Sequence, residues 1–284
     1  MANPTCTLIG HCCLDITPSG YQLGGSAAYI NAILNTLDIS PSLITGWNPP
    51  FQYESTIKKP GTKVILQQSS TTTIFENIYE NGIRKQYLRE KAEKIVWNSQ
   101  YSSMDCDILF LCPIADEVDF TFIKNMNANL KVATIQGWLR QRTSEDLIIC
   151  KVIDAKKLAG LDIIILSNED LPDYKNYISW YLNYVKIIIV TLGENGALLY
   201  TPEQKTWFPP CPSEPIDLTG AGDAFACGLT LEYYSTKNLQ KAIIKANATA
   251  SVVIENQGIH LPSHADIQHK IDTYPQELIK EIGT

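Results

Sequence analysis

The feature of this sequence that most constrains the fold is a series of short apolar runs separated by stretches with helical spacing. DILFLCPI (107–114), KVATIQ (131–136), DIIILS (162–167) and KIIIVTL (186–192) all have the length of a strand. Strands that are buried on both faces show unbroken apolar runs, whereas strands with one solvated face alternate. Such runs alternating with helices predict an α/β fold with a mostly parallel sheet covered on both faces.

Further segments complete the predicted order of elements. A chain of 284 residues suits one α/β domain, here residues 1–284, with a small appendage. Residues 5–16 and 42–47 are predicted to be strands, and Gly24-Gly25 precedes a helix. Helices are also predicted within 118–128, 145–160, 171–185, 222–236 and 238–256, and a hairpin over 186–201 turns at Asn195-Gly196.

Residues 63–96 interrupt this alternation. They are rich in Thr, Ile and Tyr and contain Asn81-Gly82, a dipeptide that suits a tight hairpin turn. We expect an exposed antiparallel hairpin that forms, with about residues 14–24, a lid that keeps water from a reacting group. An exposed strand edge can pair with a second copy, so a monomer and a lid-mediated homodimer both stay open.

The composition narrows the classes of partner. The net charge of −7 repels a phosphate-rich polymer, which predicts no nucleic-acid partner. No run approaches the roughly 18 apolar residues that span a membrane, and residues 1–10 lack the features of a signal peptide. The eight cysteines are scattered without a C-x-x-C spacing, which is typical of reduced thiols. Together these features predict a cytoplasmic protein with no membrane partner.

The stretch DLTGAGDAFACGL (217–229) places small residues and a carboxylate at the start of a predicted helix. Gly220, Ala221 and Gly222 would let backbone N–H groups approach an anion, and a helix N-terminus carries about half a positive charge. Asp223 could take a proton from a hydroxyl attacking beside that anion. These are the groups needed to move a phosphoryl group onto an alcohol. A packing loop whose carboxylate only complements the helix dipole is the alternative.

Two other phosphate-binding motifs do not fit this stretch. A dinucleotide fingerprint, G-x-G-x-x-G, would need glycine where Phe225 stands, and it belongs after the first strand. A Walker loop ends in G-K-[ST], and no lysine follows these glycines.

DLTGAGDAFACGL resembles the C-terminal signature D-T-x-G-A-G-D of the ribokinase family of PfkB-type carbohydrate kinases. LGGSAAYINAIL (23–34) resembles the family's di-glycine motif, which contacts the sugar, and VTLGENGALLY (190–200) resembles its nucleotide segment T-x-G-x-x-G. ANATASVVIENQG (246–258) resembles the last helix, which walls the adenine pocket. The resemblance spans nearly the whole chain and implies a ribokinase-like three-layer α/β/α sandwich with a small β lid. TTIFENIY, RKQYLRE, IQGWLR and SNED are similar to segments of myo-inositol kinases.

The resemblance also implies roles for single residues. Asp223 is the general base, and the N–H groups of Gly220, Ala221 and Gly222 hold the transferring phosphate. ATP and Mg²⁺ are the implied cofactors, and a requirement for a monovalent cation stays open. The implied substrate-binding residues are Asp15, Gly24, Gly25, Ser26, Tyr29, Gln136 and Arg140, although a surface ion pair is an equal alternative for Arg140; the implied nucleotide-binding residues are Thr191, Gly193, Gly196, Asp217, Thr219 and Asn247.

Two departures from the family pattern bear on the substrate and the metal. Tyr29 stands where the family often has Asn, which argues against a ribokinase or fructokinase proper. The family's N-x-x-E metal motif becomes S-x-x-D when it is counted from Ser167, so Asp170 is the favoured acid, with Asn168 and Glu169 as neighbouring candidates. Magnesium keeps most of its waters and needs few protein ligands, so this change is compatible with activity.

The sequence therefore predicts an ATP-dependent kinase that phosphorylates a hydroxyl of a sugar or of a cyclitol such as myo-inositol. One alternative is a nucleoside kinase, in which Tyr29, Trp47 and Trp138 would hold a base. Another alternative is a catalytically silent metabolite-binding protein of the same fold, which the altered SNED motif would support.

Overall fold

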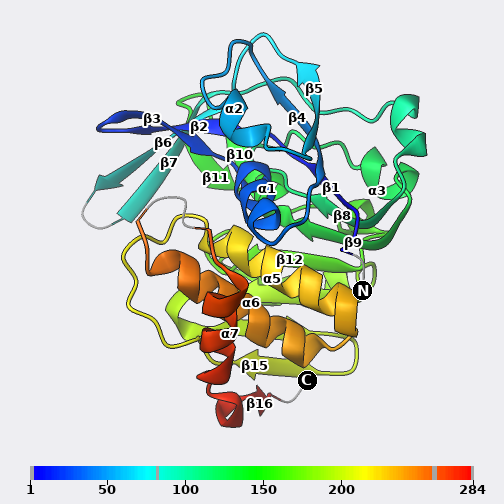
Figure 1. Cartoon of the computed structure of the whole chain (residues 1–284), viewed down its shortest axis with the longest axis vertical. Coiled ribbons are helices and arrows are strands. Elements are labelled where there is room, and N and C mark those ends of the chain that lie inside the picture. Colours follow the sequence, from blue (N-terminus) through cyan, green and yellow to red (C-terminus); the bar gives the residue numbers. More distant parts are fainter. Residues whose placement is uncertain (1–2, 81–82, 258–260, 283–284) are drawn as a thin grey trace.

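The computed structural model describes residues 3–80, 83–257 and 261–282, and a ten-stranded sheet forms the centre of this part of the chain (Figure 1). Neighbours from β5 to β13 pair in parallel, whereas β14, β15 and β16 are antiparallel. This mostly parallel sheet confirms the predicted fold class. The strands, in order across the sheet, are β16 (Lys280–Glu281), β15 (Lys205–Phe208), β14 (Ala197–Tyr200), β13 (Ile187–Thr191), β12 (Ile163–Ser167), β9 (Ala128–Thr134), β8 (Cys106–Leu111), β1 (Cys6–Ile9), β4 (Ser42–Trp47) and β5 (Lys63–Gln68).

The two faces of the sheet are covered differently. One face carries the long helices, and the other carries short helices and 3₁₀ turns with their own apolar cluster. On the first face lie α1 (Ser26–Thr36), α2 (Glu54–Ile57), α5 (Ala221–Thr236) and α6 (Leu239–Ile254), with α7 (His264–Asp272) packed on α6. The second face is covered by α3 (Thr121–Asn125), α4 (Ile178–Leu182), η1 (Ser99–Ser103), η2 (Ile135–Leu139), η3 (Ala155–Leu158) and η4 (Tyr174–Asn176).

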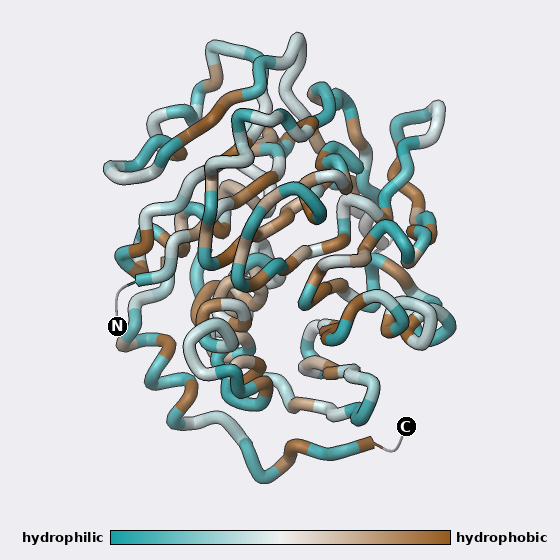
Figure 2. The backbone as a smooth tube through the Cα atoms, turned by 90° about the vertical axis from the view of Figure 1, so that its right-hand side faces the viewer, coloured by the Kyte–Doolittle hydropathy of each residue, from teal (hydrophilic) through white to brown (hydrophobic). Residues whose placement is uncertain are grey.

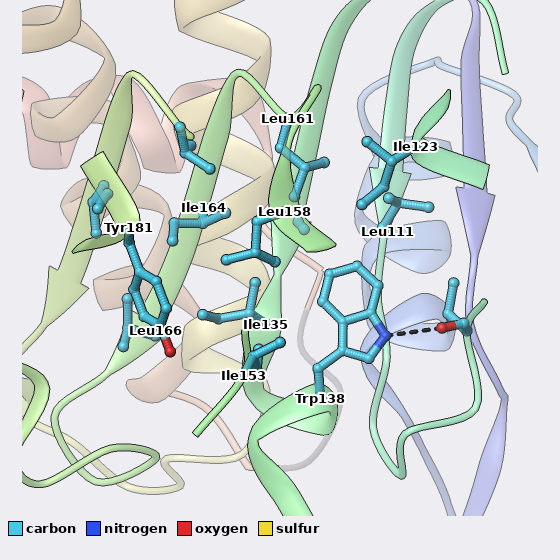
Figure 3. Packing of buried hydrophobic residues seen from close by; sticks show 14 of the residues in the cluster. Leu111, Ile123, Ile135, Trp138, Ile153, Leu158, Leu161, Ile164, Leu166 and Tyr181 are labelled. Carbon is cyan, nitrogen blue, oxygen red and sulfur yellow. Dashed lines mark hydrogen bonds between the residues drawn. The ribbon is translucent and has the colours of Figure 1, made fainter. Parts of the chain in front are cut away.

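The second face has a dense core despite its short helices. Trp138 and Leu158 pack against side chains from β12, among them Ile164 (Figure 3). The indole N–H of Trp138 donates to the backbone oxygen of Val118 at 2.9 Å, so the ring is fixed in the core. Trp47 is fully buried on the opposite face, where it stacks on Phe51 with ring centroids 5.0 Å apart. Neither tryptophan is available to hold a nucleoside base.

Three element predictions are wrong. Residues 5–16 are two strands, since the chain leaves the main sheet after β1 and begins β2 (Cys13–Thr17) in another sheet. Residues 63–68 belong to the main sheet, where they pair with β4, and are not part of the hairpin predicted over 63–96. Residues 145–160 contain β11 (Ile148–Cys150) and η3 in place of a helix. The β-branched pair Ile148-Ile149 suits the strand that tertiary pairing selects.

A second, four-stranded sheet projects beside the main one and has the order β3-β2-β6-β7 (Figure 1). It comprises β3 (Gly20–Gly24), β2, β6 (Ile74–Glu80) and β7 (Ile83–Glu90). A hairpin of β10 (Arg140–Arg142) and β11 lies against β7. The predicted turn Asn81-Gly82, like Gly258 of the last-helix segment, lies outside the described residues.

The distribution of hydropathy agrees with a closed core. Hydrophobic segments run through the interior of the trace, and hydrophilic ones dominate the outer loops (Figure 2). Among the described residues, no helix combines the length and the apolar character that a bilayer crossing requires. All eight cysteines are free; only Cys150 is exposed, and the other seven are buried. A short stretch, η5 (Gly193–Asn195), and η6 (Gln276–Leu278) complete the described elements.

Candidate active site

The predicted site residues gather at the edge of the sheet where the parallel strands end. Gln136 follows β9, Ser167 ends β12 and Thr191 ends β13. The carboxyl ends of parallel strands form the usual ligand-binding edge of an open α/β sheet. Helix α5 begins at this edge and carries Asp223 in its first turn, and β2 brings Asp15 from the four-stranded sheet.

Gly220 is the residue that aims the start of helix α5. It caps the helix with φ 81° and ψ −1°, a left-handed conformation that glycine adopts without strain. A side chain here would meet the ring of Tyr29 at 2.8 Å, so glycine also allows that close contact. The helical ladder starts at Ala224, whose N–H donates to Gly220 O at 2.9 Å. Ahead of that bond, the Ala221 N–H donates to Leu218 O at 3.3 Å, and Gly222 is exposed at the positive end of the helix.

Asp223 lies in the first turn of α5 and has a perturbed acidity. Burial raises its pKa to about 6; a hydrogen bond with the Ser26 hydroxyl and the charge of Arg140 oppose that shift, and the charge of Asp170 adds to it. A carboxylate with a pKa near 6 is mostly ionised at pH 7 yet is a stronger base than an ordinary aspartate. The surroundings of Asp223 thus suit it to accept a proton from a bound hydroxyl.

Asp15 is the second carboxylate of the site and lies on β2. Burial raises its pKa to about 6 as well, and the charge of Arg140 opposes the shift. Gly24 on β3 is paired with Cys13, diagonal to Asp15, and a Cβ there would lie 2.2 Å from Asp15 Oδ2. The absence of a side chain at Gly24 is therefore what leaves room for the carboxylate.

Arg140 connects these two carboxylates. Its positive charge lowers the pKa of both Asp15 and Asp223, so the guanidinium lies within electrostatic reach of both carboxylates. Arg140 Nη1 donates to the backbone oxygen of Ile114 at 2.8 Å, and the guanidinium lies 5.4 Å from the centre of the Phe75 ring. The structure thus gives Arg140 one partner in the loop after β8 and one on β6 of the four-stranded sheet.

Tyr29 and Ser26 enter the same space from helix α1. Tyr29 is 7% exposed, and burial, Asp223 and Asp15 together raise the pKa of its hydroxyl well above the usual value. A neutral phenol beside two carboxylates can donate a hydrogen bond without adding charge. Gly25 caps the helix with φ 97°, which turns the chain from β3 into α1.

Gln136 and Asp170 are predicted for different roles but are bonded to each other. Gln136 Nε2 donates to Asp170 Oδ1 at 2.6 Å, and Ser167 N donates to Asp170 Oδ2 at 3.0 Å. The Asn168 N–H bonds Thr191 O at 3.0 Å, and Glu169 is exposed.

The oxygen atoms around Asp170 fit a magnesium ion that keeps most of its waters. The described residues contain no cluster of three His, Cys, Asp or Glu side chains suited to a metal. Magnesium does not need one, since one or two carboxylates suffice when phosphates supply the other oxygens. Each oxygen of Asp170 retains a lone pair beyond its hydrogen bond, and the carboxylate acts electrostatically on Asp223.

The predicted nucleotide residues fall into two groups. Thr219 N donates to Asp217 Oδ1 at 2.9 Å in the exposed loop before Gly220, and Gly193 is also exposed. Gly196 and Asn247 instead lie against Pro209: a Cβ on Gly196 would approach its carbonyl carbon at 2.8 Å. Asn247 is 8% exposed, and its side-chain nitrogen donates to Tyr274 OH at 3.1 Å and to Pro209 O at 3.4 Å.

Sequence reasoning missed one buried carboxylate below the site. Glu117 is fully buried and accepts hydrogen bonds from the backbone N–H groups of His11, Ile114 and Ala115 at 2.7–3.2 Å. It thus joins the loops that follow β1 and β8. Nothing in the local sequence distinguishes Glu117 from a surface acid that caps its own loop, because the bond that ties it to the first strand comes from His11, 106 positions away.

Comparisons with known proteins bear on the family and the fold of this chain. The profile of the pfkB family carbohydrate kinases matches residues 50–266. Inositol 3-kinase from Arabidopsis thaliana is 22% identical over 276 residues, which cover 88% of this chain and 74% of that protein. A pyrophosphate-dependent kinase in the ribokinase family, complexed with a pyrophosphate analog and myo-inositol, superposes with a TM-score of 0.73 at 18% identity, over 95% of this chain and 100% of that one. Arabidopsis thaliana ribokinase complexed with ribose and ATP superposes with a TM-score of 0.74 at 14% identity, over 95% of this chain and 99% of that one.

Proposed function

Because the chain belongs to the pfkB family of carbohydrate kinases, we propose that it transfers a phosphoryl group to a hydroxyl of a cyclitol or sugar. The observation that carries the proposal is the position of Asp223 in the first turn of helix α5, beside the left-handed Gly220 cap, with Asp15 and Asp223 both within electrostatic reach of Arg140. One carboxylate accepts the proton and the other holds the acceptor.

The acceptor lies between the two carboxylates. Asp15 accepts hydrogen bonds from hydroxyls of the acceptor, since a carboxylate with two oxygens can grip neighbouring hydroxyls of a polyol. Arg140 and Tyr29 donate to other hydroxyls from the sides. The four-stranded sheet, the proposed lid, covers the acceptor and excludes water that would compete for the phosphoryl group. Likeness to an inositol 3-kinase and to a kinase complexed with myo-inositol supports a cyclitol as the acceptor.

Transfer itself depends on Asp223 and the start of α5. Asp223 takes the proton of the attacking hydroxyl as the new O–P bond forms and the P–O bond to the rest of the donor breaks, which releases ADP from ATP or phosphate from pyrophosphate. N–H groups at the mouth of α5, around Ala221 and Gly222, stabilise the negative charge of the transferring phosphoryl group. Asp170 would hold Mg²⁺, directly or through water, and the ion, when bound, neutralises charge on the donor phosphates.

The donor has two candidates. ATP is what the family resemblance implies, and a structural neighbour is a ribokinase complexed with ATP. Inorganic pyrophosphate is favoured by Asn247, whose amide is bonded to Tyr274 and Pro209 in place of a base. A neighbour named as pyrophosphate-dependent supports this second candidate.

The test is a donor-by-acceptor matrix of steady-state rates. ATP and pyrophosphate are each combined with myo-inositol, other cyclitols, hexoses and nucleosides, and the phosphorylated product is identified by NMR. We expect cyclitols to give the highest kcat/KM and Asp223→Asn to abolish the signal. Activity confined to nucleosides would replace the proposal with a nucleoside kinase. A folded protein that binds a metabolite but turns over no acceptor would favour a silent binding protein.

A further inference from the structure

The β10–β11 hairpin belongs to neither large sheet but touches both regions of the site. Its first residue is Arg140, which follows directly on η2, the turn that carries Gln136. Its tip packs on β7 of the four-stranded sheet, through a bridge between Tyr87 and Leu147. The hairpin is therefore the structural connection between a charged site residue and the proposed lid.

We propose that Asp146, at the tip of this hairpin, is a positioning residue that locks β7 to the segment carrying Arg140, so that lid placement and Arg140 placement are one event. The inference rests on the proposed function, in which Arg140 contacts the acceptor. It adds a residue that touches no substrate, and that does not belong to the motifs by which the sequence resembles kinases.

Asp146 makes contacts with both sides of the connection. Its carboxylate oxygen Oδ1 accepts hydrogen bonds from Arg142 Nε at 3.0 Å and Nη2 at 2.6 Å. Its Oδ2 lies 3.6 Å from Arg89 Nη1 of β7, and its backbone oxygen accepts from Leu88 N at 2.8 Å. A single residue thus contacts the hairpin strand β10 and the lid strand β7.

The charges around Asp146 continue into the lid. Arg89 Nε and Nη2 donate to Glu76 Oε2 of β6 at 2.8 and 2.6 Å, and its guanidinium lies 4.4 Å from the centre of the Tyr87 ring. Arg142 Nη2 also donates to Arg89 O at 2.8 Å. Two guanidinium groups and two carboxylates therefore alternate from β10 to β6. Removing the charge of Asp146, which lies between Arg142 and Arg89, leaves these two arginines to repel each other.

The other end of the hairpin fixes Arg140. Arg140 pairs with Cys150 in the two-stranded ladder, and Lys151 N donates to Leu139 O at 2.7 Å. The Arg140 guanidinium lies over the ring of Phe75 from β6. Arg140 is thus held by the hairpin backbone on one side and by the lid on the other, and a shift of the hairpin on β7 displaces it.

The side chains of Asp146, Arg89 and Arg142 are each about one-third exposed to solvent, and this exposure limits the energy of their ion pairs. Exposed pairs of this kind contribute little to global stability and are weakened by salt. Their effect is geometric: they choose one arrangement of hairpin and lid. Function should therefore change more than the melting temperature does.

The first test is Asp146→Asn. Asp146 has φ 66°, a left-handed conformation that Asn tolerates, so the variant keeps the backbone and loses only the charge. We expect the acceptor KM to rise about 5- to 20-fold, with kcat down about fivefold, the donor KM unchanged and Tm within about 2 °C. Arg142→Lys keeps the charge without the paired bonds and should fall between wild type and Asp146→Asn. Glu54→Gln, which removes the Lys58 pair on α2, is the matched control and should change nothing.

A second test needs no substrate. Hydrogen exchange of the free protein should show faster exchange of the β7 and β10–β11 amides in Asp146→Asn, about tenfold, with α6 unchanged. If wild type phosphorylates no acceptor, the proposed function fails, and exchange alone decides the role of Asp146. Unchanged exchange and an unchanged acceptor KM in a folded Asp146→Asn variant would overturn the inference. A parallel loss in donor KM, acceptor KM and Tm would reduce Asp146 to a general structural role.

Discussion

The two regions that flank Asp223, one proposed to bind the acceptor and the other the phosphoryl donor, are built differently. On the proposed acceptor side, Asp15, Arg140 and Tyr29 are wholly or partly buried; Arg140 lowers the pKa of Asp15, and Asp15 raises the pKa of Tyr29. On the donor side, the loop that leads into Gly220 is open to solvent, and its apolar residues Ile216 and Leu218 are each 69% exposed. The acceptor side has fixed charges before any ligand arrives, whereas the donor side presents backbone N–H groups and an exposed loop.

Under the proposed function, this difference predicts how the two substrates are recognised. Groups that are already oriented and desolvated need little reorganisation, so they discriminate strongly among acceptors. A helix terminus binds any phosphate, so it discriminates little among donors. We therefore expect substitutions on the two sides to separate cleanly in steady-state kinetics, with acceptor parameters more sensitive than donor parameters.

The largest effect is expected at the junction of the two sides. Asp223→Asn removes the proton acceptor while keeping the shape, and kcat should fall about 10²- to 10⁴-fold. Donor affinity, measured by calorimetry, should change less than about threefold. The same change should raise the free energy of unfolding by on the order of 1–3 kcal/mol, because it removes a charge whose burial raises its pKa from 3.8 to about 6. Retention of more than about a tenth of kcat would rule out Asp223 as the base.

The next largest effect should be confined to the acceptor side. Asp15→Asn replaces charge-assisted hydrogen bonds to hydroxyls, each worth about 1.5–3 kcal/mol. The acceptor KM should therefore rise about 10- to 100-fold, while the donor KM stays within about twofold. Equal changes in both constants would contradict the division into two sides. Gln22→Asn, on the strand that pairs with β2, serves as the control, since it shortens an exposed side chain nearby.

The donor-side signature was readable in the sequence because its chemistry is local. A left-handed cap, small residues and a carboxylate in the first turn need only consecutive positions, as Gly220 to Asp223 supply. The apolar runs likewise identified β8, β12 and β13, since strands buried on both faces need no knowledge of their partners.

The acceptor side was harder to predict because its geometry depends on distant partners. An apolar stretch such as residues 5–16 looks the same whether it stays in one sheet or crosses into another, as β1 and β2 do. The bond between Gln136 and Asp170 joins residues 34 positions apart, and the Glu117 carboxylate bonds backbone groups up to 106 positions away. Such pairings follow from sheet register, which single residues do not encode.

The pH dependence should follow the two acceptor-side carboxylates. Asp15 and Asp223 both have a pKa raised to about 6 by burial, and both must be ionised to act. The kcat/KM for the acceptor should therefore fall about 10- to 100-fold between pH 7 and pH 5. Arg140→Gln removes the positive charge that lowers both pKa values, so the acid limb should move to higher pH.

Stability should respond to pH in the opposite direction. The folded-state pKa of each carboxylate, about 6, exceeds the value of 3.8 expected when unfolded, so the folded protein binds more protons between these values. The contribution of these two groups to stability is therefore greatest below pH 4 and is lost as pH rises through 6. Thermal unfolding of wild type and of Asp223→Asn between about pH 4 and pH 7 isolates the part of this contribution that belongs to Asp223. In the kinetic experiment, an acid limb of the kcat/KM profile that does not move in Arg140→Gln would show that Arg140 does not belong to the site.

The smallest effect is expected at Asn247, where the side-chain amide is already bonded to Tyr274 and Pro209. Tyr274→Phe removes the hydroxyl that accepts from Asn247 and donates to Pro209 O at 2.5 Å. Asn247 then keeps only its 3.4 Å contact with Pro209, so its amide becomes available to a base. The ATP KM should fall about threefold and the pyrophosphate KM should stay unchanged, while Tyr234→Phe, which loses a hydrogen bond to Asp107, controls for the loss of a hydroxyl. A lower KM for both donors would place the effect at the phosphates. An unchanged ATP KM would mean that the base is bound away from Asn247, leaving the exposed loop at Ile216 and Leu218 as the donor side's apolar surface.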